Sequence, residues 1–249
     1  MVMFAWVAFA RAESVADAFP PPPGGERVPV GAWGDYVRHL ALKPPGSAVH
    51  TFDGAVVVMP AARVIDLPVG KRDLQQCADS ALRLRATFLR GAGISPAFRY
   101  SSGWLSRWDR WAAGQRPVVS GNKVTTRETR RADASDEAFD AWLEDLFTYA
   151  GTRSLVGDTA PAVTPLPGDL VMFPGSPGHA VVLLDVATTN GPGSAMETWV
   201  LVGQGYMPAM EFHVVRGPER AWYRMEGEWL PTEPLRVPWS GLRRFHGAP

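Results

Sequence analysis

Four apolar runs in the second half of the chain constrain its fold more than any other feature. Each run is rich in β-branched or aromatic residues and is bounded by Gly, Pro or polar residues, a pattern that predicts β-strands. The main helical patterns come earlier, and no repeated βαβ unit connects the two halves, so an α+β class is expected. The four runs are DLVMF (169–173), HAVVLLDV (179–186), TWVLVGQ (198–204) and MEFHVV (210–215).

Residues 73–93 show the period of an amphipathic helix. We expect the Asp73 side chain to accept hydrogen bonds from the first turn, with Gln76 completing a capping-box-like pair. Gly91 is expected to end the helix. The apolar positions recur at spacings of three and four, which predicts one buried face. They are Leu74, Cys77, Ala81, Leu84 and Phe88.

A Trp-rich stretch, residues 98–131, separates this helix from the strands. Trp104, Trp108 and Trp111 are expected on one face of a helix, so we interpret the stretch as a helical insertion. A helical aromatic stripe is either core or a platform for sugars. A further helix is expected to begin at Ser135. Its predicted buried positions are Phe139, Trp142, Leu143, Leu146 and Phe147.

The first 25 residues have the pattern of a leader followed by a tether. The apolar run from Val2 to Ala10 precedes Ala10-Arg11-Ala12, which is similar to a signal-peptide cleavage site. Residues 19–25 are Pro- and Gly-rich, which is typical of an extended linker. The apolar run is too short to span a bilayer, so no transmembrane span is expected. We expect residues 26–249 to form a single α+β domain that is exported to the periplasm or cell envelope.

Charge and motif content exclude several classes of function. Lys plus Arg and Asp plus Glu number 25 each, so no net positive field favours nucleic acid, and no nucleic-acid partner is expected. The five histidines are scattered without the spacing of metal ligands. No nucleotide-binding glycine pattern is present. We therefore expect neither a metal nor a cofactor.

Cys77 is the only cysteine, so no internal disulfide can form. It lies in the first or second turn of its predicted helix, where unpaired N–H groups and the helix dipole stabilise a thiolate. A cysteine nucleophile needs such a place and a base within reach. The alternative is a buried structural thiol, because Cys77 also lies on the apolar face of the helix.

His179 is the candidate base. It opens the HAVVLLDV strand, and a hairpin centred between Gly191 and Pro192 would place Gln204 opposite it. The amide of Gln204 would then hold one ring nitrogen and leave the other free. A register slip of one residue would turn Gln204 to the other face. Glu197 and Asp185 are alternative partners for the ring, and a strand-capping histidine is the alternative role.

These features together resemble the NlpC-type and CHAP cell-wall hydrolases. The shared pattern is a helix that starts with cysteine, a GDLVMF strand, and a histidine that opens the next strand, HAVVLLD. The resemblance implies a papain-like core, in which a nucleophile helix packs on an antiparallel sheet. It also implies Cys77 as nucleophile, His179 as base and Gln204 as the residue that orients the ring.

A second resemblance covers nearly the whole chain from about residue 26 to 246. The chain is similar to an uncharacterised family of exported bacterial proteins, a domain of unknown function. The segments that carry this similarity are LQQCADSALRLRATFL, FTYAGTRSL, GDLVMF, GSPGHAVVLLDV and QGYMPAMEFHVV. The resemblance implies one long domain and a bacterial envelope setting, and it implies no activity.

Three functional hypotheses follow. The first is a thiol hydrolase, an amidase or peptidase that acts on an amide bond in cell-wall peptides. The second is a non-catalytic envelope protein that binds a peptidoglycan-type peptide or glycan. Its substrate-binding candidates, which the hydrolase shares, are Tyr206, which follows Gln204 closely, and Trp104 and Trp108. The third is a structural module with no small ligand.

Overall fold

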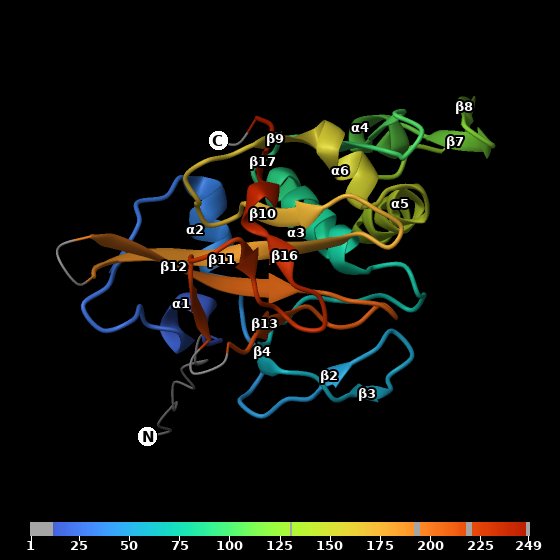
Figure 1. Cartoon of the computed structure of the whole chain (residues 1–249). Coiled ribbons are helices and arrows are strands. Elements are labelled where there is room, and N and C mark those ends of the chain that lie inside the picture. The colour runs from blue at the N-terminus through green and yellow to red at the C-terminus, as the bar shows by residue number, and fades with distance from the viewer. Residues whose placement is uncertain (1–11, 130, 192–194, 218–220, 248–249) are drawn as a thin grey trace, which may run out of the picture.

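A nine-stranded antiparallel sheet forms the centre of the protein (Figure 1). The computed structural model describes residues 12–129, 131–191, 195–217 and 221–247. The α+β class predicted from the sequence is confirmed. The strands run, from one edge to the other, β4 (Ala61–Val64), β13 (His213–Val215), β12 (Met196–Gln204), β11 (His179–Asn190), β10 (Leu170–Phe173), β17 (Leu242–Phe245) and β9 (Thr159–Pro161). In addition, β1 (Glu26–Arg27) pairs with β11, and β14 (Trp222–Arg224) pairs with β12.

One face of the sheet is covered by helices, of which α3 lies against β11. The alternate residues Ala180, Val182 and Leu184 of β11 point into this helical core. The predicted helix after Ser135 is confirmed: Ser135 caps it, and its five predicted apolar positions are buried. The helices are α1 (Val15–Ala18), α2 (Ala32–Arg38), α3 (Cys77–Gly91), α4 (Trp108–Ala112), α5 (Asp136–Tyr149) and α6 (Thr152–Asp158).

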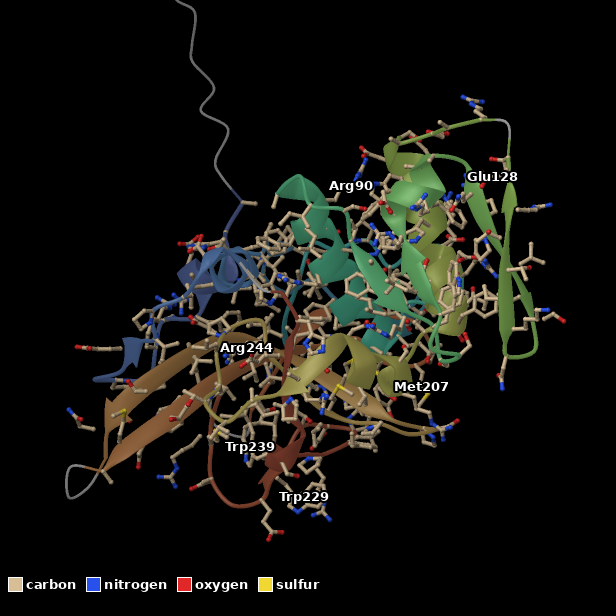
Figure 2. The ribbon with its side chains drawn as sticks, turned by 90° about the horizontal axis from the view of Figure 1, so that it is seen from above. Arg90, Glu128, Met207, Trp229, Trp239 and Arg244 are labelled. Atoms are coloured by element: carbon tan, nitrogen blue, oxygen red, sulfur yellow. The ribbon has the colours of Figure 1, made fainter. Side chains whose placement is uncertain are left out.

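The C-terminal segment covers the opposite face. Val181 and Leu183 point into a second core there, together with Trp239 and Leu230. Figure 2 shows the labelled Trp229 and Trp239 on the side of the sheet away from the helices. The described residues of this segment thus wrap over that face of the sheet. Its elements are β15 (Trp229–Leu230), β16 (Val237–Pro238) and the 3-10 helix η2 (Trp239–Gly241).

The Trp-rich stretch is not the continuous helix that the sequence predicts. Its first part is a hairpin, because Gly103 adopts a φ of 86° and the N–H of Tyr100 bonds to the carbonyl of Trp104 at 2.9 Å. Only Trp108 and Trp111 lie in the short helix α4. Figure 1 shows β7 and β8 protruding beyond α4 and α5. The small ribbons are β2 (Val49–His50) with β3 (Val56–Val57), β5 (Ala97–Arg99) with β6 (Leu105–Arg107), and β7 (Gln115–Ser120) with β8 (Lys123–Glu128).

Residues 12–25 pack onto the folded domain instead of forming an extended tether. Val15 is fully buried, and Pro22 is buried as well. Asp185, at a bulge in β11, accepts hydrogen bonds from Arg27 at 2.6 Å and from Arg38 at 2.7 Å. The two arginines join the N-terminal segment to the centre of the sheet. The signal-like residues 1–11 lie outside the described residues.

None of the helices in the described part of the chain is both long and apolar enough to cross a membrane.

Candidate functional site

Cys77 is the first residue of helix α3. The cap is Gln76 rather than the predicted Asp73, and the Asp79 carboxylate accepts the N–H of Gln76 at 3.2 Å. The chain turns at residues 71–74, so Asp73 lies outside the helix. The Asp73 carboxylate instead accepts the backbone N–H of Ala209 at 2.6 Å. The later helix start places the sulfur at the end of α3, where the dipole and unpaired N–H groups are strongest.

Two opposing effects act on the Cys77 thiol. Burial is the larger one and raises the pKa of Cys77 above its ordinary value. Backbone N–H groups of Ala180, Ala78 and Cys77 itself lower this pKa, whereas the charge of Asp79 raises it. The helix start therefore stabilises a thiolate as the sequence predicts, but burial outweighs it. The resting thiol is protonated at neutral pH.

The ring of His179 is fully buried and is held by Gln204. Its Nε2 lies 3.1 Å from the Gln204 side-chain oxygen. The Gln204 amide nitrogen donates to the carbonyl of Glu233 at 2.8 Å, so the oxygen of Gln204 is the atom that faces the ring. Nε2 must then carry the proton, and Nδ1 has a lone pair. No hydrogen-bond partner for Nδ1 is present among the described residues.

Burial also lowers the pKa of His179, against a smaller raising effect of the Gln204 hydrogen bond. The imidazole is consequently neutral at neutral pH and able to accept a proton at Nδ1. The unpaired Nδ1 costs stability, because a buried polar atom without a partner loses its water without compensation. What distinguishes it from the other unpaired buried atoms of the described structure is that His179 lines a cavity together with Cys77.

The contact between His179 and Gln204 exists although the predicted register is wrong. Gly203 lies opposite Val182, so the register continued along the strands places Gln204 two positions from His179. A shift of two residues keeps the same face of the sheet. A diagonal pair of this kind is close enough for long side chains to meet. The other two candidates bond elsewhere: Asp185 to its two arginines and Glu197 to Arg224.

Cys77 and His179 line one cavity of about 440 Å³. Tyr206 also lines it, and its ring meets the His179 ring edge-on, with centroids 5.5 Å apart. Among the described contacts, no hydrogen bond joins the Cys77 sulfur to the imidazole. Figure 2 labels Met207, another lining residue, at the end of the sheet away from the β11–β12 turn.

Two glycines allow the strands to approach the helices around this cavity. A Cβ on Gly205 would overlap the Ser80 hydroxyl and would lie 3.2 Å from the carbonyl oxygen of Gln76. A Cβ on Gly178 would overlap the hydroxyl of Thr152. Close approach favours glycine at both positions, and Gly178 lies in the cavity wall next to His179.

Asp79 is a cavity residue that sequence reasoning missed. Burial raises its pKa to about 8, and its Oδ1 has no hydrogen-bond partner among the described residues. The carboxyl group is thus largely protonated at neutral pH. An acidic residue at the third position of a helix is an ordinary cap. Only its distance of two residues from the sole cysteine could have singled it out.

The predicted aromatic binding residues are not in this cavity, apart from Tyr206. Trp108 is 7% exposed and packs in the core against Phe139 and Trp142. Trp104 lines a separate, smaller pocket beside Arg107. The hairpin at Gly103 separates Trp104 from the helix, so the single Trp face expected from the sequence does not form.

No group of three or more His, Cys, Asp or Glu side chains in the described residues is arranged to hold a metal ion. The other buried histidine, His213, bonds through Nδ1 to the carbonyl of Glu211 at 2.9 Å. Its Nδ1 thus has a local partner, whereas its Nε2 has none among the described residues. His213 does not line the cavity that Cys77 and His179 share.

Comparisons with known proteins identify a family and no activity. Neither the curated proteins nor the solved structures include a significant match to the chain. A family model described as a domain of unknown function (4846) matches residues 15–244. The match begins at the buried Val15 and ends in β17, so it covers nearly all of the described fold. The chain belongs to this family, domain of unknown function (4846).

Proposed function

We propose that this protein is an exported thiol hydrolase that cleaves an amide bond, with cell-wall peptides as its substrate class. One observation carries the proposal. The chain's only cysteine, at the start of α3, shares a cavity with a buried histidine, one nitrogen of which is held by Gln204. The other nitrogen has no hydrogen-bond partner in the part of the chain that the structure describes. A nucleophile, a base and a residue that orients the base are the parts of cysteine-hydrolase chemistry.

The protonation states favour general-base activation of a neutral thiol. His179 Nδ1 takes the thiol proton as the Cys77 sulfur forms a bond to the substrate carbonyl carbon. The imidazolium then returns this proton to the departing amine as the C–N bond breaks, leaving a thioester. Water attacks the thioester, giving its proton to His179, and the acid product leaves as the thiol is restored.

The start of α3 supplies charge stabilisation for these steps. The N–H groups of Cys77 and Ala78 act on the sulfur, as their effect on its pKa indicates. The same donors stabilise an oxyanion that forms beside the sulfur. Gln204 fixes the ring by accepting from Nε2, and Tyr206 covers the ring edge. No hydrogen bond joins the sulfur to the ring in the described structure, and under this proposal substrate binding brings the two together.

The papain-like core is part of the same proposal. A helix that begins with cysteine packs on an antiparallel sheet, and the histidine opens the strand against which this helix lies. The GDLVMF strand β10 pairs with the histidine strand β11, with Phe173 opposite His179. This order supports the resemblance to NlpC-type and CHAP hydrolases, and with it a substrate in the cell wall.

A non-catalytic envelope-binding protein is the second candidate. The observation in its favour is the raised pKa of Cys77, because a protonated, half-buried thiol is also what a structural cysteine presents. Under this alternative the cavity binds a peptide without cleaving it.

Digestion of isolated bacterial cell walls separates the two candidates. Purified protein is incubated with peptidoglycan sacculi and with a mixed peptide library, and new amino termini are identified by mass spectrometry. We expect cleavage by the wild type and by Trp104→Ala, whose side chain lies outside the cavity, and none by Cys77→Ser. Binding of either material without new termini would support the second candidate and contradict the first.

A further inference from the structure

A second cavity, which we call the aromatic groove, lies at the far end of the β11–β12 hairpin. Its volume is about 670 Å³. Residues of the C-terminal segment form one wall, and the ends of β11 and β12 form the other. The groove residues used below are Thr189, Glu197, Trp199, Trp222, Arg224, Glu226 and Trp229.

The charged side chains that line the groove are one arginine and two glutamates, so the cluster carries one net negative charge. Arg224 bonds to Glu197 at 3.0 Å and also to Glu226, so its guanidinium is held between two carboxylates. No cation is left over in this cluster for a phosphate or carboxylate ligand. A paired Arg and two Glu side chains still offer oxygen acceptors and N–H donors in fixed positions. The cluster thus disfavours an anionic ligand and offers hydrogen bonds to a polar one.

One buried donor in the groove wall lacks a partner. Trp222 is 6% exposed, and its indole N–H makes no hydrogen bond among the described residues. The indole N–H of Trp199, in contrast, donates to Thr189 at 3.0 Å. The Trp222 indole nitrogen is sealed from solvent within the core, so a molecule in the groove does not reach it.

The exposed aromatic surface is the third feature. Trp229 is 40% exposed at the groove. Arg236 lies over its ring, 4.4 Å from the centroid, which holds the ring in place. Aromatic faces carry negative charge and attract the weakly positive C–H groups of a sugar ring. An apolar wall with a few fixed polar groups is the usual construction of a small-molecule site.

We propose that the aromatic groove binds a neutral carbohydrate chain. A pyranose ring supplies the C–H face for Trp229, and its hydroxyl groups both donate and accept, which matches the N–H donors and oxygen acceptors of the Glu–Arg cluster. An anionic ligand would meet two carboxylates, and a purely apolar ligand would leave the polar groups unpaired. A neutral saccharide meets neither obstacle.

The groove and the Cys77–His179 cavity lie at opposite ends of one strand. His179 begins β11 and lines the cavity, whereas Thr189 lines the groove. Ten residues of extended strand separate them by about 30 Å. A substrate that occupies both sites is therefore a polymer with a glycan part and a peptide part. This last step rests on the proposed hydrolase function, but the carbohydrate site itself does not.

Titration of the purified full chain with N-acetylchitohexaose, a neutral β-linked oligosaccharide, tests the carbohydrate site. Binding is measured by isothermal titration calorimetry, with a neutral hexapeptide of Gly and Ser as the competing ligand class. We expect saturable binding of the saccharide that Trp229→Ala weakens at least about tenfold, as loss of a hot-spot aromatic residue does. Trp104→Ala, a matched substitution at another surface, should leave the dissociation constant within about twofold.

The outcomes are separable from those of the hydrolase proposal. Cys77→Ser should bind the saccharide as the wild type does, whether or not the protein cleaves amides. Glu226→Gln, at an exposed groove position, serves as a second groove variant and should also weaken binding. Absence of saturable saccharide binding by the wild type, preference for the hexapeptide, or equal binding by Trp229→Ala and Trp104→Ala would overturn the carbohydrate site.

Discussion

The Gln204 side-chain oxygen lies 3.1 Å from His179 Nε2, and this contact determines which ring nitrogen is free. Because the Gln204 amide nitrogen is committed to the carbonyl of Glu233, Gln204 faces the ring with its acceptor. The proton is fixed on Nε2, and the lone pair is fixed on Nδ1. Gln204, which is remote from His179 in sequence, thus selects the His179 tautomer that can act as a base.

Removing this contact should affect both catalysis and stability. Gln204→Leu leaves the His179 Nε2–H and the Glu233 carbonyl without their partner. We expect a loss of about 1–3 kcal/mol in the free energy of unfolding, measured by urea denaturation. If amide hydrolysis occurs, it should fall about 10-fold to 100-fold in kcat because the base is no longer oriented. An unchanged kcat in a folded variant would contradict the orienting role.

The raised pKa of Asp79 predicts a pH dependence of stability. The native state binds a proton on Asp79 up to about pH 8, whereas the unfolded chain releases it near the ordinary value of 3.8. The unfolded state therefore binds fewer protons in this window, and the free energy of unfolding falls as pH rises from about 4 to 8. When urea denaturation is measured at a series of pH values, Asp79→Asn should remove the contribution of Asp79 to the fall of the free energy of unfolding with pH. Asp109→Asn, at a surface position, is the matched control, and an equal slope in both variants would exclude Asp79 as its source.

Asp79 should also affect the pKa of the Cys77 thiol. Its charge raises the pKa of Cys77, so removing that charge lowers the pKa. We expect the pH midpoint of iodoacetamide alkylation, followed by mass spectrometry of the single cysteine, to shift downward in Asp79→Asn relative to the wild type. A midpoint that stays in place, or moves up, would show that the two side chains are not coupled.

Because Gly205 lies very close to α3, a larger residue at this position should destabilise the protein, and a second substitution in α3 should restore part of the lost stability. In Gly205→Ala the new methyl group overlaps the Ser80 hydroxyl. Overpacking of this kind costs about 1–3 kcal/mol, measured by thermal or urea unfolding. The double variant Gly205→Ala with Ser80→Ala removes that overlap, and the Ser80 Cβ then lies at an ordinary 3.4 Å. Part of the loss should return, and strictly additive losses would contradict this packing.

Local patterns predicted much of the fold. The strands at Leu170, His179 and His213 and the helix after Ser135 follow directly from short-range apolar periodicity. The predictions from sequence fail where a single turn determines the course of the chain. The positive φ of Gly103 interrupts the expected Trp helix. The turn at residues 71–74 moves the start of α3 to Cys77. A local apolar pattern does not report such turns.

The site was only partly predictable for a related reason. His179 and Gln204 belong to adjacent strands, so turn symmetry was sufficient to bring them to one face. The packing of the Pro-rich residues 19–25 depends on long-range contacts such as Arg27 with Asp185, 158 residues apart. The unusual pKa of Asp79 depends on burial by the assembled fold. Sequence spacing carries neither of these effects.

Trapping of an acyl group on Cys77 tests the central claim most directly, because it needs no knowledge of the natural substrate. The protein is mixed with an N-acetylalanine p-nitrophenyl ester, quenched in acid, and analysed by intact mass and peptide mapping. We expect a thioester on Cys77 both in the wild type and in Trp104→Ala. In His179→Ala the same thioester should form about 100-fold more slowly. A Cys77 that stays unmodified in the wild type, or that acylates as fast without His179, would contradict a catalytic pair.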